Sequence, residues 1–251
     1  MAIPHNNSVT LTHDEWNLLS NVLSAYDEQN LVQKTENAIK TQLSLPPKLR
    51  SKQMHTLNLL GLFYSSINSF LERSPFFNAL SPDLRRLMIE NNLNGTGALN
   101  LLYTAAQAKL FDHLYLIVNC DRIYGSDYVQ ENQRLVARLD NNGTLIKLML
   151  MILSFASNSS PLIYQQSRNS TTHSSESISI ALLRIQNIFI TMMWKYLVYQ
   201  YGFHDAVKRF DHLVKNYLDI LNRINANLTR AHLAMLDEIL NKTTNALTYD
   251  H

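Results

Sequence analysis

Long stretches with helical periodicity, broken by few glycines and prolines, constrain the fold of this chain more than any other feature of its sequence. The 251 residues include six glycines and six prolines, and most of these lie between the periodic stretches. In the clearest stretch the apolar residues recur three or four positions apart, so that they share one face of a helix: Ile185, Ile188, Phe189, Met192, Met193 and Tyr196. The sequence therefore predicts an all-α chain.

The breaks set the bounds of the expected helices. These cover about residues 13–30, 32–43, 51–74, 82–111, 128–140 and 144–156. Two more lie on either side of Gly202, the last over 203–240. The first helix follows a capping box formed by Thr12 and Glu15.

The helix over 51–74 is apolar on nearly all sides, which is typical of a central helix enclosed by others. Gly61 in its middle predicts a close crossing with another helix. Three stretches depart from the helical pattern. Residues 94–97 predict a kink, 113–119 a short strand followed by a turn, and 157–177 a long polar loop.

The last two helices cannot bury their apolar faces alone, which argues against a domain boundary at the polar loop. We therefore expect one domain over residues 1–251. Its core covers 12–240, and residues 241–251 form a tail.

Composition argues against several classes of function. The 22 basic and 20 acidic residues leave a formal charge of +2 and form no basic run, so we expect no binding to nucleic acid. Cys120 is the single cysteine, which excludes a disulfide framework and a zinc finger. The longest apolar run, 145–156, is too short to span a membrane and contains Lys147.

The sequence also lacks the motifs on which common classes of enzyme depend. It contains no glycine-rich phosphate loop, zinc-protease motif or serine-hydrolase motif. His204 and His212 are eight residues apart on one predicted helix, a poor spacing for two metal ligands. We expect no catalytic residue, no cofactor and no metal, and we interpret the alternating charges of 205–219 as a solvated helix face.

A connector between two predicted helices is unusually apolar. Residues 74–88 read SPFFNALSPDLRRLM, with Phe76, Phe77 and Leu80 ahead of a helix start at Pro82. Connectors on a protein surface are normally polar. We therefore expect this one to be buried and to fix the central helix to the helix that follows it.

The connector and the helix end before it resemble the signature of the nuclear receptor ligand-binding domain. Six residues match its aromatic, aliphatic, acidic and closing hydrophobic positions: Phe70, Phe77, Leu80, Asp83, Leu87 and Met88. The start of the chain resembles the first helix of divergent invertebrate receptors, and 194–224 resembles the family's ninth to eleventh helices. The resemblance covers about residues 12–240.

The resemblance implies a three-layer antiparallel helical sandwich of about ten or eleven helices, with a short β-turn at 113–119. It also implies an apolar cavity for a small hydrophobic ligand, lipid-like or sterol-like. The candidate ligand residues are Leu60, Phe63, Tyr64, Ile67, Leu101, Leu102, Ala105 and His232. Ser65, Ser66, Tyr103 or His232 would supply its polar contacts. Packing in the core is the alternative interpretation of each candidate ligand residue.

The family's second site is a groove that holds an amphipathic helix of a coregulator. The candidates here are Glu72, Arg73, Arg85, Arg86 and Glu238. Glu72 stands where the family has a lysine. Residues 235–240 resemble an activation helix with Glu238 as its acidic clamp, unless 228–240 ends the eleventh helix.

The family also dimerises through its tenth and eleventh helices, with itself or with another nuclear receptor. The candidate interface residues are Phe210, Leu213, Val214, Tyr217 and Leu221. We therefore expect a ligand-binding-type domain that regulates transcription in the nucleus, or also acts in the cytoplasm. The alternative is an all-α structural or interaction scaffold without a ligand. The sequence leaves open the ligand, the direction of regulation and whether the chain is a short receptor or one domain of a longer one.

Overall fold

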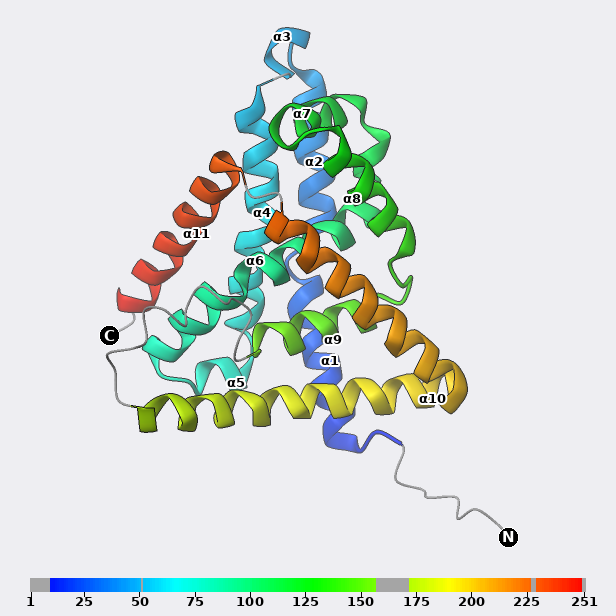
Figure 1. Ribbon diagram of the computed structural model, residues 1–251, viewed down its shortest axis with the longest axis vertical. Helices are drawn as coiled ribbons and strands as arrows, with labels where there is room; N and C mark the ends of the chain where they lie inside the picture. Colours follow the sequence, from blue (N-terminus) through cyan, green and yellow to red (C-terminus); the bar gives the residue numbers. More distant parts are fainter. Residues whose placement is uncertain (1–9, 51, 157–171, 227–228, 250–251) are drawn as a thin grey trace.

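A computed structural model describes residues 10–50, 52–156, 172–226 and 229–249 of the chain. All secondary structure in these ranges is helical, as predicted (Figure 1). The elements in chain order are α1 (His13–Asp27), α2 (Leu31–Ser44), α3 (Pro47–Arg50), α4 (Gln53–Leu71), α5 (Pro75–Asn78), α6 (Pro82–Gln107), η2 (Leu110–Asp112), α7 (Leu114–Tyr124), α8 (Ser126–Arg138), α9 (Gly143–Ser154), α10 (Thr172–Ala226) and α11 (Arg230–Tyr249). No helix in the described ranges is long and apolar enough to cross a membrane.

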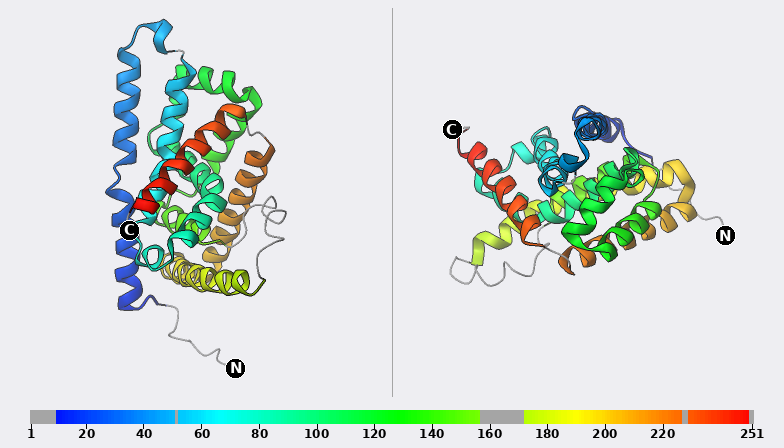
Figure 2. Two further views of the ribbon diagram at one scale, coloured as in Figure 1. Left: turned by 90° about the vertical axis from the view of Figure 1, so that its left-hand side faces the viewer. Right: turned by 90° about the horizontal axis from the view of Figure 1, so that it is seen from above.

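Local sequence signals place the first two helices. The Thr12 backbone N–H donates to the Glu15 carboxylate at 2.8 Å, and the Glu15 N–H donates to Thr12 Oγ1 at 3.3 Å, which confirms the capping box. Asn30, with a φ of 50°, separates α1 from α2, because asparagine tolerates the left-handed region. The two helices then follow one another along one side of the molecule (Figure 2).

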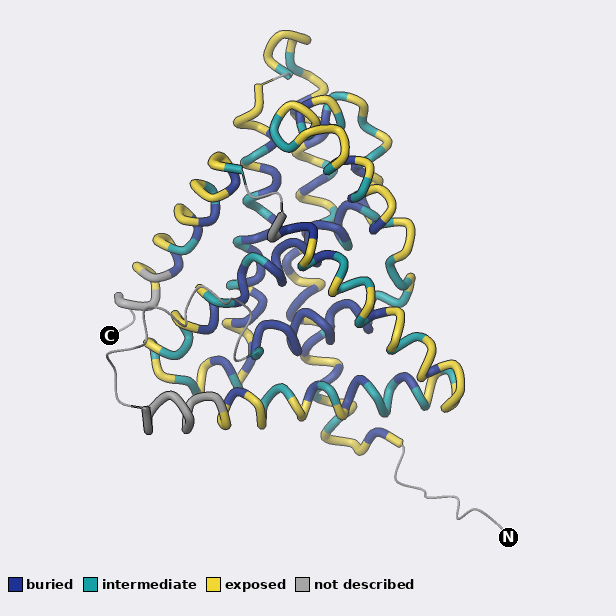
Figure 3. Tube along the Cα trace, in the orientation of Figure 1, coloured by how far each residue is buried: buried dark blue, intermediate teal, exposed yellow. Residues whose placement is uncertain are grey.

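Three helices, α4, α6 and α9, form the centre of the molecule (Figure 3). Every residue of α9 from Leu145 to Ser154 is buried. Lys147 can lie in this stretch because its Nζ reaches Asp27 Oδ1 at 2.5 Å. The larger hydrophobic cluster draws on α1, α4, α6, α9, α10 and α11, so that the final helices bury their apolar faces against the rest of the chain.

The helix α10 consists of two arms that meet at Gly202. The first arm (172–201) runs along the base of the molecule, and the second arm (203–226) rises across it (Figure 1). Gly202 has a φ of 74°, a backbone conformation that a side chain would strain. The prediction that a helix ends at this glycine is therefore confirmed.

Residues 114–119 begin α7 and do not form the predicted strand and turn. Leu116 and Asn119 are buried, while Leu114 and Val118 are exposed. This spacing of three and four residues is that of a helix. The apolar and β-branched residues of the run favour a strand locally, but packing of α7 against α8, η2 and α4 decides its structure.

The predicted polar loop and the predicted tail each overlap a helix. Residues 172–177 belong to α10 and 241–249 to α11, while 157–171 lie outside the described residues. Helix α11 continues past residue 240 because its buried face continues, with Thr243 four residues beyond Ile239.

The prediction that the apolar connector between α4 and α6 is buried is confirmed for Phe77 and only in part for its neighbours. Phe77 is fully buried, and the Arg85 guanidinium lies 5.8 Å from the centroid of its ring. Phe76 and Leu80 are half-buried, and the Phe76 ring packs edge-to-face on Phe189 of α10 with 5.6 Å between centroids. The connector thus joins α4, α6 and α10.

The glycines of α6 serve close packing instead of the predicted kink, since the helix is continuous through 94–97. A Cβ atom on Gly97 would lie 2.2 Å from Tyr64 Cδ1, so only glycine lets the Tyr64 ring lie on the backbone of α6. A Cβ on Gly61 would meet Met235 Cγ at 3.6 Å, an ordinary contact. The close crossing therefore lies at Gly97, and its prediction at Gly61 is wrong.

Gly97→Ala and Gly61→Ala form a matched pair of substitutions inside helices. We expect Gly97→Ala to lower the free energy of unfolding by about 1–3 kcal/mol, because the new methyl group displaces the Tyr64 ring. Gly61→Ala should raise it by about 0.5–1 kcal/mol through helix propensity. Urea denaturation followed by circular dichroism measures both, and equal effects would contradict the position of the close crossing.

Phe77→Asp places a carboxylate in the buried connector, and we expect it to lower the free energy of unfolding by at least about 4 kcal/mol. Ala79→Asp, two residues away on an exposed position, is the control and should change stability by no more than about 0.5 kcal/mol. Thermal denaturation of the two variants gives the comparison. Similar melting temperatures would show that the connector does not hold the core together.

Candidate functional site

The eight candidate ligand residues are all buried, but only four of them line one cavity. Leu60, Leu101, Leu102 and Ala105 lie in the wall of an apolar cavity of about 50 Å³. The cavity is enclosed by α4, α6, η2, α7 and α8. Its other lining residues are Thr56, Leu59, Leu110, Phe111, Leu116, Ile117, Cys120, Tyr124, Tyr128, Val129 and Asn132.

Phe63, Tyr64, Ile67 and His232 do not line this cavity and instead pack in the core. The Tyr64 ring lies on Gly97 and meets the His232 ring edge-to-face, with 5.3 Å between centroids. For these four residues the alternative interpretation, core packing, describes their position.

The cavity is small for the ligand that the sequence resemblance implies. Typical small-molecule pockets enclose about 300–1,000 Å³, against about 50 Å³ here. Two polar atoms in its wall, Thr56 Oγ1 and Asn132 Oδ1, are buried without a hydrogen-bond partner among the described residues. A space of this size suits a few water molecules or a small fragment, and a sterol would require the wall to move.

A polar cluster lies between α7, α8, α10 and α11. The Tyr124 hydroxyl and His232 Nδ1 are 2.9 Å apart, and the Arg223 guanidinium lies 4.5 Å from the centroid of the Tyr128 ring. Burial and, to a smaller extent, the positive charge of Arg223 together lower the pKa of His232 to about 4. The imidazole is therefore neutral at pH 7, so α11 packs on the core without burying a charged histidine.

The described part of the chain shows the surroundings of the potential metal ligands and of the cysteine. No group of three His, Cys, Asp or Glu side chains in that part is arranged to hold a metal ion. Burial raises the pKa of the Cys120 thiol to about 11, so the thiol is protonated at neutral pH and is a poor nucleophile.

One buried hydrogen-bond network joins α1, α4 and α6, and no sequence motif reveals it. The Tyr26 hydroxyl donates to Asn100 Oδ1 at 2.6 Å. Asn100 Nδ2 donates to the Phe63 carbonyl at 2.7 Å and to Ser66 Oγ at 2.9 Å. Ser66, a candidate polar contact for a ligand, is thus engaged within the core.

The three candidate arginines of the coregulator groove are engaged elsewhere. Arg73 pairs with Glu28 at the end of α1, and Arg86 pairs with Glu90 at 2.7 Å along α6. Arg85 lies over the Phe77 ring and donates to a connector carbonyl. The structure therefore does not gather these arginines around one groove.

Glu238 does border a groove, which lies between α4 and α11 and has a volume of about 530 Å³. The Glu238 carboxylate pairs with Lys242, one turn away, at 2.6 Å. Glu72 adjoins the groove, since it accepts a hydrogen bond at 2.9 Å from Asn68 in the groove wall. The residues that line this α4–α11 groove include the apolar set Leu57, Gly61, Leu62, Met235 and Ile239.

The candidate dimer residues face largely inward. Leu213 is 5% exposed and belongs to the core of its own chain, so its assignment to an interface is wrong for this conformation. Phe210, Val214, Tyr217 and Leu221 are half-buried. The apolar side chains that this arm of α10 exposes most are Phe203, Leu218 and Val207.

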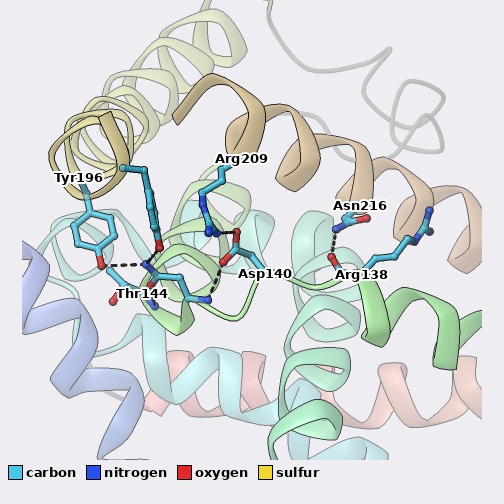
Figure 4. Close-up of polar contacts among 8 residues, drawn as sticks. Arg138, Asp140, Thr144, Tyr196, Arg209 and Asn216 are labelled. Carbon is cyan, nitrogen blue, oxygen red and sulfur yellow. Dashed lines mark hydrogen bonds and ion pairs between the residues drawn. The ribbon is translucent and has the colours of Figure 1, made fainter. Parts of the chain in front are cut away.

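Charged residues of the second arm of α10 reach the connection between α8 and α9 (Figure 4). Arg209 pairs with Asp140 at 2.6 Å, and Arg138 pairs with Asp219 at 3.0 Å. Asn216 Nδ2 also donates to the Arg138 carbonyl at 2.7 Å. The charged side chains of 205–219 are exposed to solvent as predicted, and two of them, Arg209 and Asp219, in addition pair with residues at the end of α8 and in the α8–α9 connection.

Asn142 ties the same connection to the first arm of α10. Its Oδ1 accepts a hydrogen bond from the Thr144 N–H at 3.0 Å and so caps the start of α9. Asparagine is one of the residues preferred at this position. Its Nδ2 donates to the hydroxyls of Tyr201 at 2.7 Å and Tyr196 at 3.2 Å. The short α8–α9 connection therefore holds both arms of α10 at their bend.

The structure thus gathers part of each predicted site separately. Four of the eight ligand residues line one cavity, and the two acidic members of the coregulator set lie at the α4–α11 groove. Comparison of the chain with protein-family models and with curated protein sequences finds no match.

His232 makes stability depend on pH. Its pKa of about 4 in the folded state is below the ordinary value of 6.5, so the unfolded chain binds the proton more tightly. The stabilisation is complete above pH 6.5 and falls as the pH drops toward 4. We expect the free energy of unfolding to fall by about 2 kcal/mol more between pH 7 and pH 5 in the native chain than in His232→Gln.

Urea denaturation at the two pH values measures this difference. His204→Gln, which alters an exposed histidine on α10, is the control and should keep the pH dependence of the native chain. An unchanged pH dependence in His232→Gln would show that this imidazole is not the group responsible.

Proposed function

We propose that this chain is a regulatory binding module of the nuclear receptor ligand-binding type, which acts on transcription in the nucleus through contacts with other proteins. The observation that carries the proposal is the burial of the connector at Phe77 between α4 and α6. The sequence resembles the family signature at this connector, and the signature describes a segment that fixes the central helix to its neighbour. An exposed connector would have favoured an unrelated helical scaffold.

The α4–α11 groove supports a helical coregulator as the partner. Amphipathic helices bind by placing their apolar face into such a groove. The groove has an apolar floor that includes Leu62 and Met235, and Glu238 with Lys242 stands at its edge. Glu238 is the acidic residue that the resemblance assigns to the clamp. Lys242 takes the place of the missing lysine of the clamp in this proposal.

A dimer and a ligand remain further parts of the same proposal. Phe210, Val214, Tyr217 and Leu221 are half-buried and extend the apolar surface of α10 toward a second receptor chain. A small hydrophobic ligand would need more room than about 50 Å³, and this room would come from separation of α7 and α8.

The second candidate function is an all-α interaction scaffold that binds no ligand. The small volume of the cavity favours the scaffold, because the lining side chains leave only about 50 Å³ of free space. Native mass spectrometry of the purified chain separates the candidates. A co-purified lipid or sterol supports the ligand-binding module, and a bare chain supports the scaffold.

A reporter assay tests regulation of transcription. We expect residues 1–251, fused to a heterologous DNA-binding domain, to raise or lower reporter output relative to that domain alone. Glu238→Lys should remove most of this effect, because it reverses the charge at the groove edge and leaves Lys242 beside a second cation.

Asp237→Lys is the matched control, since it makes the same charge change at an exposed position that does not line the groove. It should leave the effect intact. A fusion that does not alter reporter output would contradict the proposed function, and equal losses in both variants would contradict the assignment of the groove.

A further inference from the structure

A second groove lies at the far end of the molecule, where α2, α3 and α7 meet (Figure 1). It has a volume of about 480 Å³. We call it the apical groove and define it by the lining residues Leu43, Pro47, Arg50, Leu114, Val118 and Arg122. It shares no lining residue with the α4–α11 groove.

The apical groove exposes apolar side chains that folding leaves uncovered. Leu114 is 73% exposed, the highest value among the large hydrophobic residues that the structure describes. Leu43 and Val118 in the same groove are 40% and 37% exposed. Neighbouring apolar side chains with this exposure are typical of a surface that binds another molecule.

Buried amides hold the walls of the groove in place. The Arg50 carbonyl accepts hydrogen bonds from Asn119 Nδ2 of α7 at 3.1 Å and from Gln42 Nε2 of α2 at 3.3 Å. Arg50 Nε donates to the Leu45 carbonyl at 2.7 Å. Because α2, α3 and α7 are tied together at one residue, a ligand would meet a preformed surface and lose little entropy in ordering it.

The surroundings of the groove are positively charged. Residues 40–55 contain four basic residues and no acidic one, whereas the whole chain carries +2, so the rest of the chain is net negative. Lys40, Lys52 and Arg122 take part in none of the ion pairs of the described residues. Asp112 is the one acidic residue that lines the groove.

We infer that the apical groove binds an acidic amphipathic helix of a partner protein. The apolar face of that helix lies on Leu43, Leu114 and Val118, and its carboxylates lie beside Arg50 and Arg122. This inference goes beyond the proposed function, because it concerns another end of the molecule and a partner of defined charge. It stands whether or not the chain binds a ligand or regulates transcription.

Two synthetic helical peptides of about 18 residues test the inference. Both carry leucines along one face; one carries glutamates beside this face, and the other carries lysines at the same positions. We expect the glutamate peptide to bind at least about tenfold more tightly in fluorescence anisotropy, with an affinity that falls between about 0.1 M and about 0.5 M NaCl.

Leu114→Ser and Arg122→Glu should each weaken the glutamate peptide by about tenfold or more. Both positions are exposed, so the variants should fold, and circular dichroism checks this. Leu218→Ser, which removes a 51% exposed leucine on α10, is the control and should bind as the native chain does.

Three results would overturn the inference. The first is equal affinity for the two peptides, and the second is unchanged binding in both Leu114→Ser and Arg122→Glu. The third is sedimentation of the chain with vesicles of phosphatidylcholine and phosphatidylserine, lost in Leu114→Ser, without binding of the glutamate peptide. This last result would assign the apical groove to a lipid surface.

Discussion

The close crossing of α4 and α6 is the constraint on which the rest of the structure depends. The Tyr64 ring lies on the bare backbone at Gly97, which brings the two helices near enough for Asn100 to bond the Phe63 carbonyl. Tyr26 then joins α1 to the same network. Burial of one large aromatic side chain contributes about 1.5–3 kcal/mol to the free energy of unfolding. The crossing of α4 and α6 determines where several such side chains are buried.

The same packing limits what the chain can bind inside. Tyr64 and its neighbours fill the centre, so the remaining space lies on the side of α7 and α8 and measures about 50 Å³. A larger ligand must bind an opened state more tightly than this one, and it must supply the free energy of that opening from its own contacts. A partner that binds a surface groove does not have to supply the free energy of such an opening, and this is why we propose partner binding ahead of ligand binding.

The sequence predicted the features that depend on local pattern. The capping box at Thr12, the end of a helix at Gly202 and the burial of Phe77 follow from turn chemistry and hydrophobic spacing. Residues 113–119 favour a strand by their apolar and β-branched composition, and it is packing of α7 against α8, η2 and α4, which local pattern does not reveal, that makes them helical.

Side-chain partners from distant parts of the chain leave no such signal. Nothing near Arg209 in the sequence indicates Asp140, and nothing near Tyr26 indicates Asn100. Arg73 of the predicted coregulator groove is an example: it has the expected charge, but the fold brings Glu28, 45 residues away in the sequence, to it. Residue type predicted the chemistry available, and only the fold determined which groups meet.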